Sequence, residues 1–161
     1  MSNIKHKLNE QDNKNKRSSF RSGLLKTQYK SLIGEFIKDV WKARSITNID
    51  KHLSEDFVDH DSWLGSTQDL ESWKKGFEDF CNSFSNYKFS LEKLISESDT
   101  VAIKYNIVIE NSQNSPLTNG LNSNHIILFG VDMYRIARGK IAERWGLNIN
   151  SAITQTQKNY N

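Results

Sequence analysis

The chain of 161 residues has the length of a single domain. Its formal net charge of +3 is unevenly distributed, because residues 1–30 carry eight Lys or Arg and two acids, whereas residues 31–161 carry fourteen basic and seventeen acidic groups. The single cysteine, Cys81, excludes an intramolecular disulfide and provides no zinc motif. No apolar run has the length of a membrane span, and the polar N-terminus lacks the apolar core of a secretory signal. We therefore expect a cytoplasmic protein.

The composition divides the chain into three parts. Residues 1–23 are rich in Asn, Lys, Ser and Gln and predict a disordered or loosely helical basic arm. Residues 24–150 hold the periodic apolar patterns of one α+β domain, and residues 151–161 are a polar, flexible tail. A basic arm can contact nucleic acid or an anionic surface. The body has no basic run with interleaved aromatics, so we interpret the arm as a solvated tail and expect no nucleic-acid or membrane partner.

Three helices are predicted in the first half of the domain. From Leu24 onward, apolar residues recur at three- and four-residue spacings as far as Trp41. A short second helix follows, with Thr47 or Asn48 as its N-cap. A third helix, capped by Ser66 or Thr67, has the strongest amphipathic pattern. Its apolar face consists of Leu70, Trp73, Phe77, Phe80, Cys81 and Phe84.

Strands fill the second half. Alternating patterns begin at residues 87 and 101, and an Asn- and Ser-rich loop of residues 111–124 leads to a third strand from His125. A tight turn at residues 137–140, with Gly139 in a left-handed position, joins it to a fourth strand. Helices followed by a strand meander predict an α+β fold, in which N-terminal helices pack in a curved antiparallel sheet of about four strands.

Asp132 is unusual because it lies in the middle of an apolar strand. If the turn pairs Ile136 with Ile141, then Asp132 faces Trp145 and Tyr134 faces Glu143 on one side of the sheet. Two interpretations remain open. Asp132 is either a paired or solvated structural carboxylate, or an acid/base group whose pKa is raised at the floor of an apolar pocket.

An acidic cluster at residues 55–61 ends in a histidine. Four carboxylates and His60 within seven residues suggest a metal site at first, but their spacing matches no metal-ligand motif, so we expect a solvated turn. His60 either fixes the backbone of this turn or lies at a cavity mouth, where it exchanges protons near neutral pH.

Several of these motifs resemble the SnoaL-like polyketide cyclases of the nuclear transport factor 2-like superfamily. The similarity covers residues 25–150 and rests on an Asp-x-φ-Arg strand (φ, apolar) at 132–135, a Gly-Lys-Ile turn at 139–141, a Glu-x-Trp strand at 143–145 and a Phe-x-x-His segment at 57–60. It implies a cone-shaped fold with an apolar pocket, closed by the loop of residues 111–124. The chain departs from the family by offering only Asn148 and Asn150 where members often carry a late Asp.

The resemblance implies two classes of function. The first is a cofactor-free cyclase, isomerase or hydrolase, in which Asp132 is the acid/base group and His60, with His125 as a weaker candidate, hydrogen-bonds the substrate. The substrate, a small hydrophobic molecule, would also contact Trp41, Trp63, Tyr134, Trp145 and Glu143. The second is a non-catalytic module that binds a small ligand or a protein. Under either, we expect a homodimer through the sheet face, because Ile126, Leu128, Val131 and Met133 cannot all face one pocket.

Overall fold

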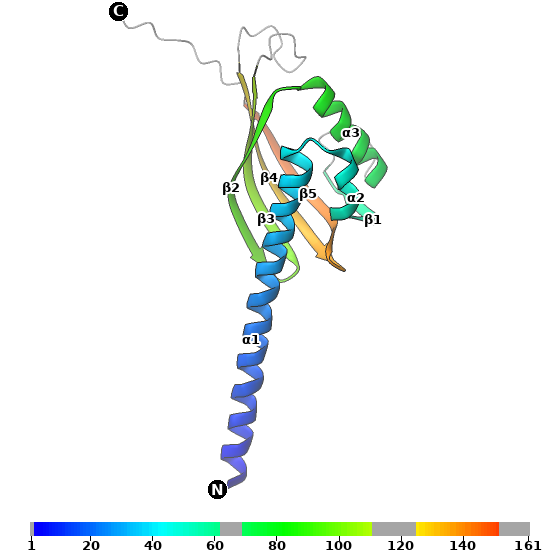
Figure 1. Ribbon diagram of the computed structural model, residues 1–161. Helices are drawn as coiled ribbons and strands as arrows, with labels where there is room; N and C mark the ends of the chain where they lie inside the picture. Colours follow the sequence, from blue (N-terminus) through cyan, green and yellow to red (C-terminus); the bar gives the residue numbers. More distant parts are fainter. Residues whose placement is uncertain (1, 62–68, 111–124, 152–161) are drawn as a thin grey trace, which may run out of the picture.

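The computed structural model describes residues 2–61, 69–110 and 125–151 of the chain (Figure 1). The helical part consists of α1 (Ser2–Phe36), the π-helix η1 (Ile37–Lys42), the 3-10 helix η2 (Ile46–Asn48), α2 (Ile49–His52) and α3 (Leu70–Ser83). The strands are β1 (Leu53–Asp59), β2 (Tyr87–Glu97), β3 (Thr100–Glu110), β4 (His125–Ala137) and β5 (Lys140–Ser151). The predicted α+β class is confirmed.

One mixed sheet carries the fold, with the strand order β1-β5-β4-β3-β2. Strands β2 to β5 form the expected antiparallel meander, and β1 adds a fifth strand that pairs parallel to β5. The expectation of a solvated turn at residues 55–61 was wrong for its first five residues. Glu55 and Asp56 are exposed, but Phe57 and Asp59 are buried, so the acidic composition concealed a strand with one side in the core.

The helices pack on one face of the sheet, which we call the inner face (Figure 1). The predicted apolar face of β3, with Val101, Ile103, Tyr105, Ile107 and Ile109, is buried beneath them. The amphipathic pattern of α3 is also confirmed, although Asp69 is its N-cap and accepts a 2.8 Å bond from the amide of Ser72. The other face, the outer face, is covered by no described helix.

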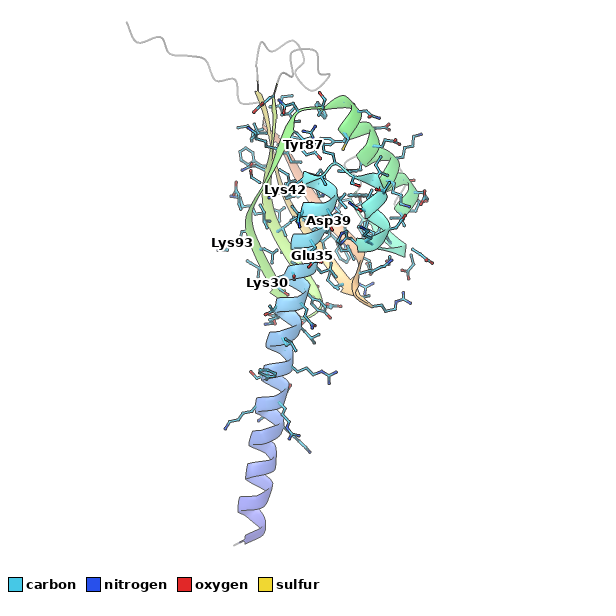
Figure 2. The ribbon with its side chains drawn as sticks, viewed as in Figure 1. Lys30, Glu35, Asp39, Lys42, Tyr87 and Lys93 are labelled. Carbon is cyan, nitrogen blue, oxygen red and sulfur yellow. The ribbon has the colours of Figure 1, made fainter. Side chains whose placement is uncertain are left out.

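Helix α1 extends well beyond the body (Figure 1). In Figure 2, Lys30 and Glu35 lie where the helix meets the sheet, and the turns before them project away from it. Phe20, in this projecting part, is 77% exposed. The helix passes residue 23 without a break, so no change in secondary structure marks the predicted start of the domain. The division into arm, domain and tail stays a prediction.

The β4–β5 hairpin differs from its predicted register by one residue. Arg138 and Gly139 form the tight turn, both with positive φ (52° and 76°), and Ile136 pairs with Ile141 as expected. A β-bulge between Arg135 and Ile136 then shifts the register. Because side chains alternate along a strand, the shift moves every later partner to the opposite face. The resulting pairs are Arg135 with Glu143, Tyr134 with Arg144, Met133 with Trp145 and Asp132 with Gly146.

Candidate functional site

Asp132 lies on the inner face of β4, with only 1% of its surface exposed. The guanidinium of Arg144 donates to both of its carboxylate oxygens, from Nη2 to Oδ1 at 2.9 Å and from Nε to Oδ2 at 3.2 Å. The hydroxyl of Tyr134 donates to Oδ2 at 2.8 Å, and that of Tyr105 makes a longer contact of 3.5 Å with Oδ1. Asp132 is therefore both buried and fully hydrogen-bonded.

Arg144 binds a second carboxylate with its remaining side. Its Nη1 donates to the two oxygens of Asp59 at 2.8 and 3.0 Å and to the backbone carbonyl of Asp61 at 3.2 Å. Asp59 and Arg144 are 2% and 1% exposed. We call Asp59, Tyr105, Asp132, Tyr134 and Arg144 the buried acid cluster. It joins four strands, β1, β3, β4 and β5, at one point of the inner face.

Two glycines leave room for the cluster. A Cβ atom on Gly146, which pairs with Asp132, would lie 2.2 Å from Nη2 of Arg144 and 2.6 Å from Oδ1 of Asp132. A Cβ atom on Gly130 would lie 2.3 Å from the ring of Tyr105. Both distances are far below van der Waals contact. The glycines thus allow a long arginine and a tyrosine to lie flat across neighbouring strands.

The charges of the cluster do not balance when all groups are ionised in the usual way. Two carboxylates face one guanidinium, which leaves a net charge of −1 in a site without water contact. Burial raises the pKa of Asp132 above its ordinary value, and Arg144 opposes this rise. Burial and the nearby Asp132 also raise the pKa values of Tyr105 and Tyr134. Ionisation of Asp132 is therefore less favourable here than in water, and both phenols stay protonated.

A second group of predicted site residues lies on the outer face. The ring of His60 stacks on Trp145 with centroids 4.6 Å apart and planes 2° from parallel. Its Nε2 is 2.7 Å from Oε2 of Glu143, and Arg135 donates from Nε to Oε1 of the same carboxylate at 2.6 Å. We call these four residues the outer cluster. The expectation that Trp145 and Glu143 share a face with Asp132 was wrong, because the bulge reverses their side.

The other predicted residues lie elsewhere. Trp41 is 2% exposed and packs edge-on against Phe77 and Trp73 in the core. His125 is the first residue of β4 and pairs with Glu110, and its side chain lies outside the described part of the structure. Trp63 and the loop of residues 111–124 lie outside the described residues. The roles in binding proposed for these residues stay predictions.

Sequence reasoning missed Asp59, Tyr105 and Arg144 as site residues. Tyr105 was predicted to be buried, but only as part of an apolar strand face. Asp59 has a detectable signal, because it follows Phe57 with the two-residue period of a buried strand face. Arg144 has none, because the register shift that places it beside Asp132 is invisible in the sequence.

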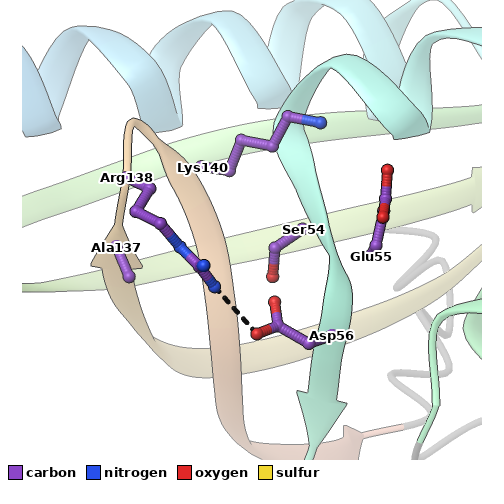
Figure 3. A pocket seen from close by; sticks show the side chains of 6 residues that line it. All are labelled: Ser54, Glu55, Asp56, Ala137, Arg138 and Lys140. Atoms are coloured by element: carbon purple, nitrogen blue, oxygen red, sulfur yellow. Dashed lines mark hydrogen bonds and ion pairs between the residues drawn. The ribbon is translucent and has the colours of Figure 1, made fainter.

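Two described hollows lie near the edge of the sheet. One has a volume of about 380 Å³ between β1 and the β4–β5 turn, and Ser54, Glu55, Asp56, Ala137, Arg138 and Lys140 line it (Figure 3). The other, of about 540 Å³, shares Glu55 and Lys140 with it and continues to the start of α3. Both are bordered largely by charged groups, and Asp132 lines neither. An apolar pocket in front of Asp132 stays a prediction.

Membrane-spanning helices and metal-binding clusters are both absent from the described residues. None of the helices there is long and apolar enough to cross a membrane. No group of three or more His, Cys, Asp or Glu side chains in those segments is arranged to hold a metal ion.

The fold and the sequence together define the class of protein. The family model of the SnoaL-like polyketide cyclases matches residues 31–156, and the chain belongs to this family. The resemblance on which the sequence analysis relied is thereby confirmed. Among curated proteins, no sequence matches the chain.

Solved structures show the same fold at low sequence identity. AclR from Streptomyces galilaeus superposes with a TM-score of 0.65 at 19% identity, over 78% of this chain and 81% of its own. IdmH from Streptomyces antibioticus gives 0.65 at 17% identity, over 75% and 91%. A SnoaL-like polyketide cyclase from Agrobacterium tumefaciens gives 0.61 at 11% identity, over 75% and 91%. At these identities the similarity establishes the fold alone.

Proposed function

We propose that this protein is a cofactor-free acid/base enzyme, a cyclase or isomerase that moves a proton next to a carbonyl group of a small hydrophobic substrate. The observation that carries the proposal is the buried acid cluster, in which Asp132 is 1% exposed and shares Arg144 with a second carboxylate. A carboxyl group whose pKa is raised by burial is better suited to taking up and returning a proton than an ordinary carboxylate. Membership of the SnoaL-like polyketide cyclase family supports this class of chemistry.

In the proposed reaction, the Asp132 carboxylate accepts a proton from the carbon next to the carbonyl. The electron pair of the broken C–H bond forms an enolate, which attacks a second carbonyl carbon in a cyclase or is reprotonated at another carbon in an isomerase. In both cases the proton comes back from Asp132, to the alkoxide oxygen formed by the cyclase or to the new carbon position in the isomerase. Tyr134 donates its single O–H to Asp132 at 2.8 Å, and it can turn this O–H to the enolate oxygen once the carboxylate has taken up the proton. His60 has no part in this scheme, because it belongs to the outer cluster.

The test compares two isosteric substitutions on the paired strands β4 and β5. Asp132→Asn removes the proton carrier, whereas the control Glu143→Gln changes a carboxylate on the outer face. With β-keto esters and cyclic ketones as probes, we expect Asp132→Asn to reduce turnover by about 10²- to 10⁴-fold. Glu143→Gln should retain turnover within a factor of about three. Full activity of Asp132→Asn would remove Asp132 from the mechanism.

A specific observation favours a second function, that of a non-catalytic binding module. The aromatic rings of the inner face pack closely in front of the buried acid cluster, and Phe36 lies against Tyr134 with centroids 6.0 Å apart. Substrate reaches Asp132 only when such rings move apart. If the unmodified protein and both variants all leave every probe at the uncatalysed rate, the cluster is a structural ion-pair network and the binding function is the better account.

We also propose that the protein forms a homodimer through the outer face. As expected, the four residues behind this prediction do not share one face, because Ile126 and Leu128 are buried on the inner face whereas Val131 and Met133 are exposed. The exposed apolar residues of the outer face are Ile95, Val131, Met133 and Leu147. Two charged pairs beside them form within the chain, Arg135 with Glu143 and Lys104 with Glu92. These four groups therefore need no counter-charge from a second copy.

Sedimentation of the full chain tests the dimer. Val131→Lys places a charge at the centre of the outer face and should convert a dimer into a monomer. The control is Phe20→Lys, on the projecting part of α1. Phe20 is more exposed than Val131 (77% against 48%) but lies away from the sheet, so this variant should leave the dimer intact. A monomer in the unmodified protein at micromolar concentration would contradict the proposal.

A further inference from the structure

Asp59 is a buried carboxylate that the proposed reaction does not use. It comes from the edge strand β1, is 2% exposed, and directs both oxygens to Nη1 of Arg144. In the sequence it occupies one of the two unspecified positions of the Phe-x-x-His segment, between Phe57 and His60. A buried charge in such a place needs a physical reason, since an unpaired one is strongly unfavourable.

The charged and titratable groups around Asp132 show which carboxylate shares Arg144 with it. The titratable groups that contact Asp132 are Arg144 from β5, Tyr134 from its own strand and Tyr105 from β3. On the helical side, Phe36 of α1 packs against Tyr134 and brings no charge. The carboxylate of Asp61 accepts a bond from the amide of Gly146 at 3.2 Å, and its contact with the guanidinium is made by its backbone carbonyl. Among the described carboxylates, Asp59 is thus the one that competes with Asp132 for Arg144.

This competition decides how strongly Arg144 acts on Asp132. An arginine paired with one carboxylate holds that group in its ionised form, which makes it a poor proton carrier. Here the Nη1 side of the guanidinium is occupied by Asp59 and the Nε–Nη2 side by Asp132. The negative charge of Asp59 offsets part of the positive charge that Asp132 would otherwise experience. Asp59 also fixes the plane of the guanidinium, because Nη1 contacts both of its oxygens.

We propose that Asp59 is a positioning residue that, acting through Arg144, allows Asp132 to hold a proton. The catalytic use of that proton rests on the function proposed above, whereas the coupling between the two carboxylates does not. The buried acid cluster then works as one unit, with a proton carrier on β4, a shared cation on β5 and a counter-charge on β1. A residue of the edge strand β1 thus controls how readily Asp132, on β4, takes up and releases its proton.

The test is a titration of the Asp132 carboxyl carbon by NMR, with the signal assigned by comparison with Asp132→Asn. In the unmodified protein we expect an apparent pKa above the ordinary value of 3.8. In Asp59→Asn the full charge of Arg144 acts on Asp132, and its pKa should fall by about one unit or more. The matched control is Asp61→Asn, which removes an equal charge two residues away that does not bond the guanidinium, and it should shift the pKa by less than about 0.3 units.

Each outcome decides the proposal. A pKa of Asp132 that is the same in Asp59→Asn and in the unmodified protein overturns it, and so does an equal shift in Asp61→Asn. If Asp59→Asn does not fold, the smaller Asp59→Ser takes its place in the titration, and a pKa of Asp132 equal to that in the unmodified protein again overturns the proposal.

Kinetics separate this proposal from the proposed function. Where turnover is measurable, the acid limb of the pH–rate profile should move to lower pH in Asp59→Asn by the same amount as the NMR titration. A shifted titration without any turnover would support the coupling and contradict the enzyme. Turnover that depends on Asp132 but has an unshifted profile in Asp59→Asn would support the enzyme and contradict the role of Asp59.

Discussion

The hairpin of β4 and β5 carries two arginine–carboxylate pairs, one on each face of the sheet. In one pair the arginine comes from β5 and in the other from β4, and the two pairs differ greatly in solvent exposure. On the inner face, Arg144 of β5 binds Asp132 of β4, and both side chains are at most 2% exposed. On the outer face, Arg135 of β4 binds Glu143 of β5, with the side chains 37% and 23% exposed. Residues adjacent in sequence thus form chemically similar pairs on opposite sides of one sheet. The difference in solvent exposure, and not the position in the sequence, decides how strongly each pair shifts the pKa of its carboxyl group.

The largest difference between the pairs should appear when the arginines are removed. Arg144→Met leaves Asp59 and Asp132 buried beside each other without a cation, and we expect a loss of about 3–5 kcal/mol in the free energy of unfolding. Arg135→Met leaves Glu143 half-exposed and still bonded to His60, and should cost less than about 1 kcal/mol. Urea unfolding of both variants at pH 7 measures the difference. Equal losses would show that burial does not distinguish the two pairs.

A smaller effect is expected from filling the space that the inner pair needs. Gly146→Ala places a methyl group against Arg144 and Asp132, and should destabilise the protein by about 1–3 kcal/mol. The control, Gly34→Ala, adds the same methyl group in α1, where no atom lies within 4 Å. Because alanine favours a helix over glycine, this control should raise the free energy of unfolding by about 0.5–1 kcal/mol. A neutral Gly146→Ala in thermal unfolding would mean that Arg144 has another place to lie.

The smallest expected effect is the pH dependence of the free energy of unfolding, which should have opposite signs for the two pairs. The folded state raises the pKa of Asp132 chiefly by burial, so its contribution favours folding at low pH and is lost as the pH rises above 3.8 through the folded pKa. The pKa of Glu143 is lowered by its bonds to His60 and Arg135. Its contribution is therefore present above the ordinary value of 4.5, is lost as the pH falls, and should stay below about 1 kcal/mol.

Isosteric variants separate these signs. As the pH rises from 3.5 to 7, Asp132→Asn should gain stability relative to the unmodified protein, and Glu143→Gln should lose it. Urea unfolding at several pH values gives both slopes. Parallel slopes would contradict the comparison.

The sequence predicted the helices, the meander and the importance of Asp132, because each has a local signal in periodicity or in an unexpected residue type. It also predicted the turn around Gly139 correctly. It failed at the faces of β5, since the extra residue of a bulge has no distinctive composition, and a shift of one residue exchanges Arg144 with Glu143 and Trp145. It failed at β1 because its exposed acids suggested a solvated turn, although Phe57 and Asp59 kept the period of a strand.

The parallel pairing of β1 with β5 has a consequence for how the protein is made. Asp59 and Arg144 are 85 positions apart, so a ribosome has to synthesise nearly the whole domain before the two can meet. Until β5 emerges, Asp59 is a solvated carboxylate on an unpaired strand, and the meander lacks the strand beside which β1 fits. The cluster therefore closes in the last stage of biosynthesis, and a chain truncated before residue 144 would have all the helices but no site.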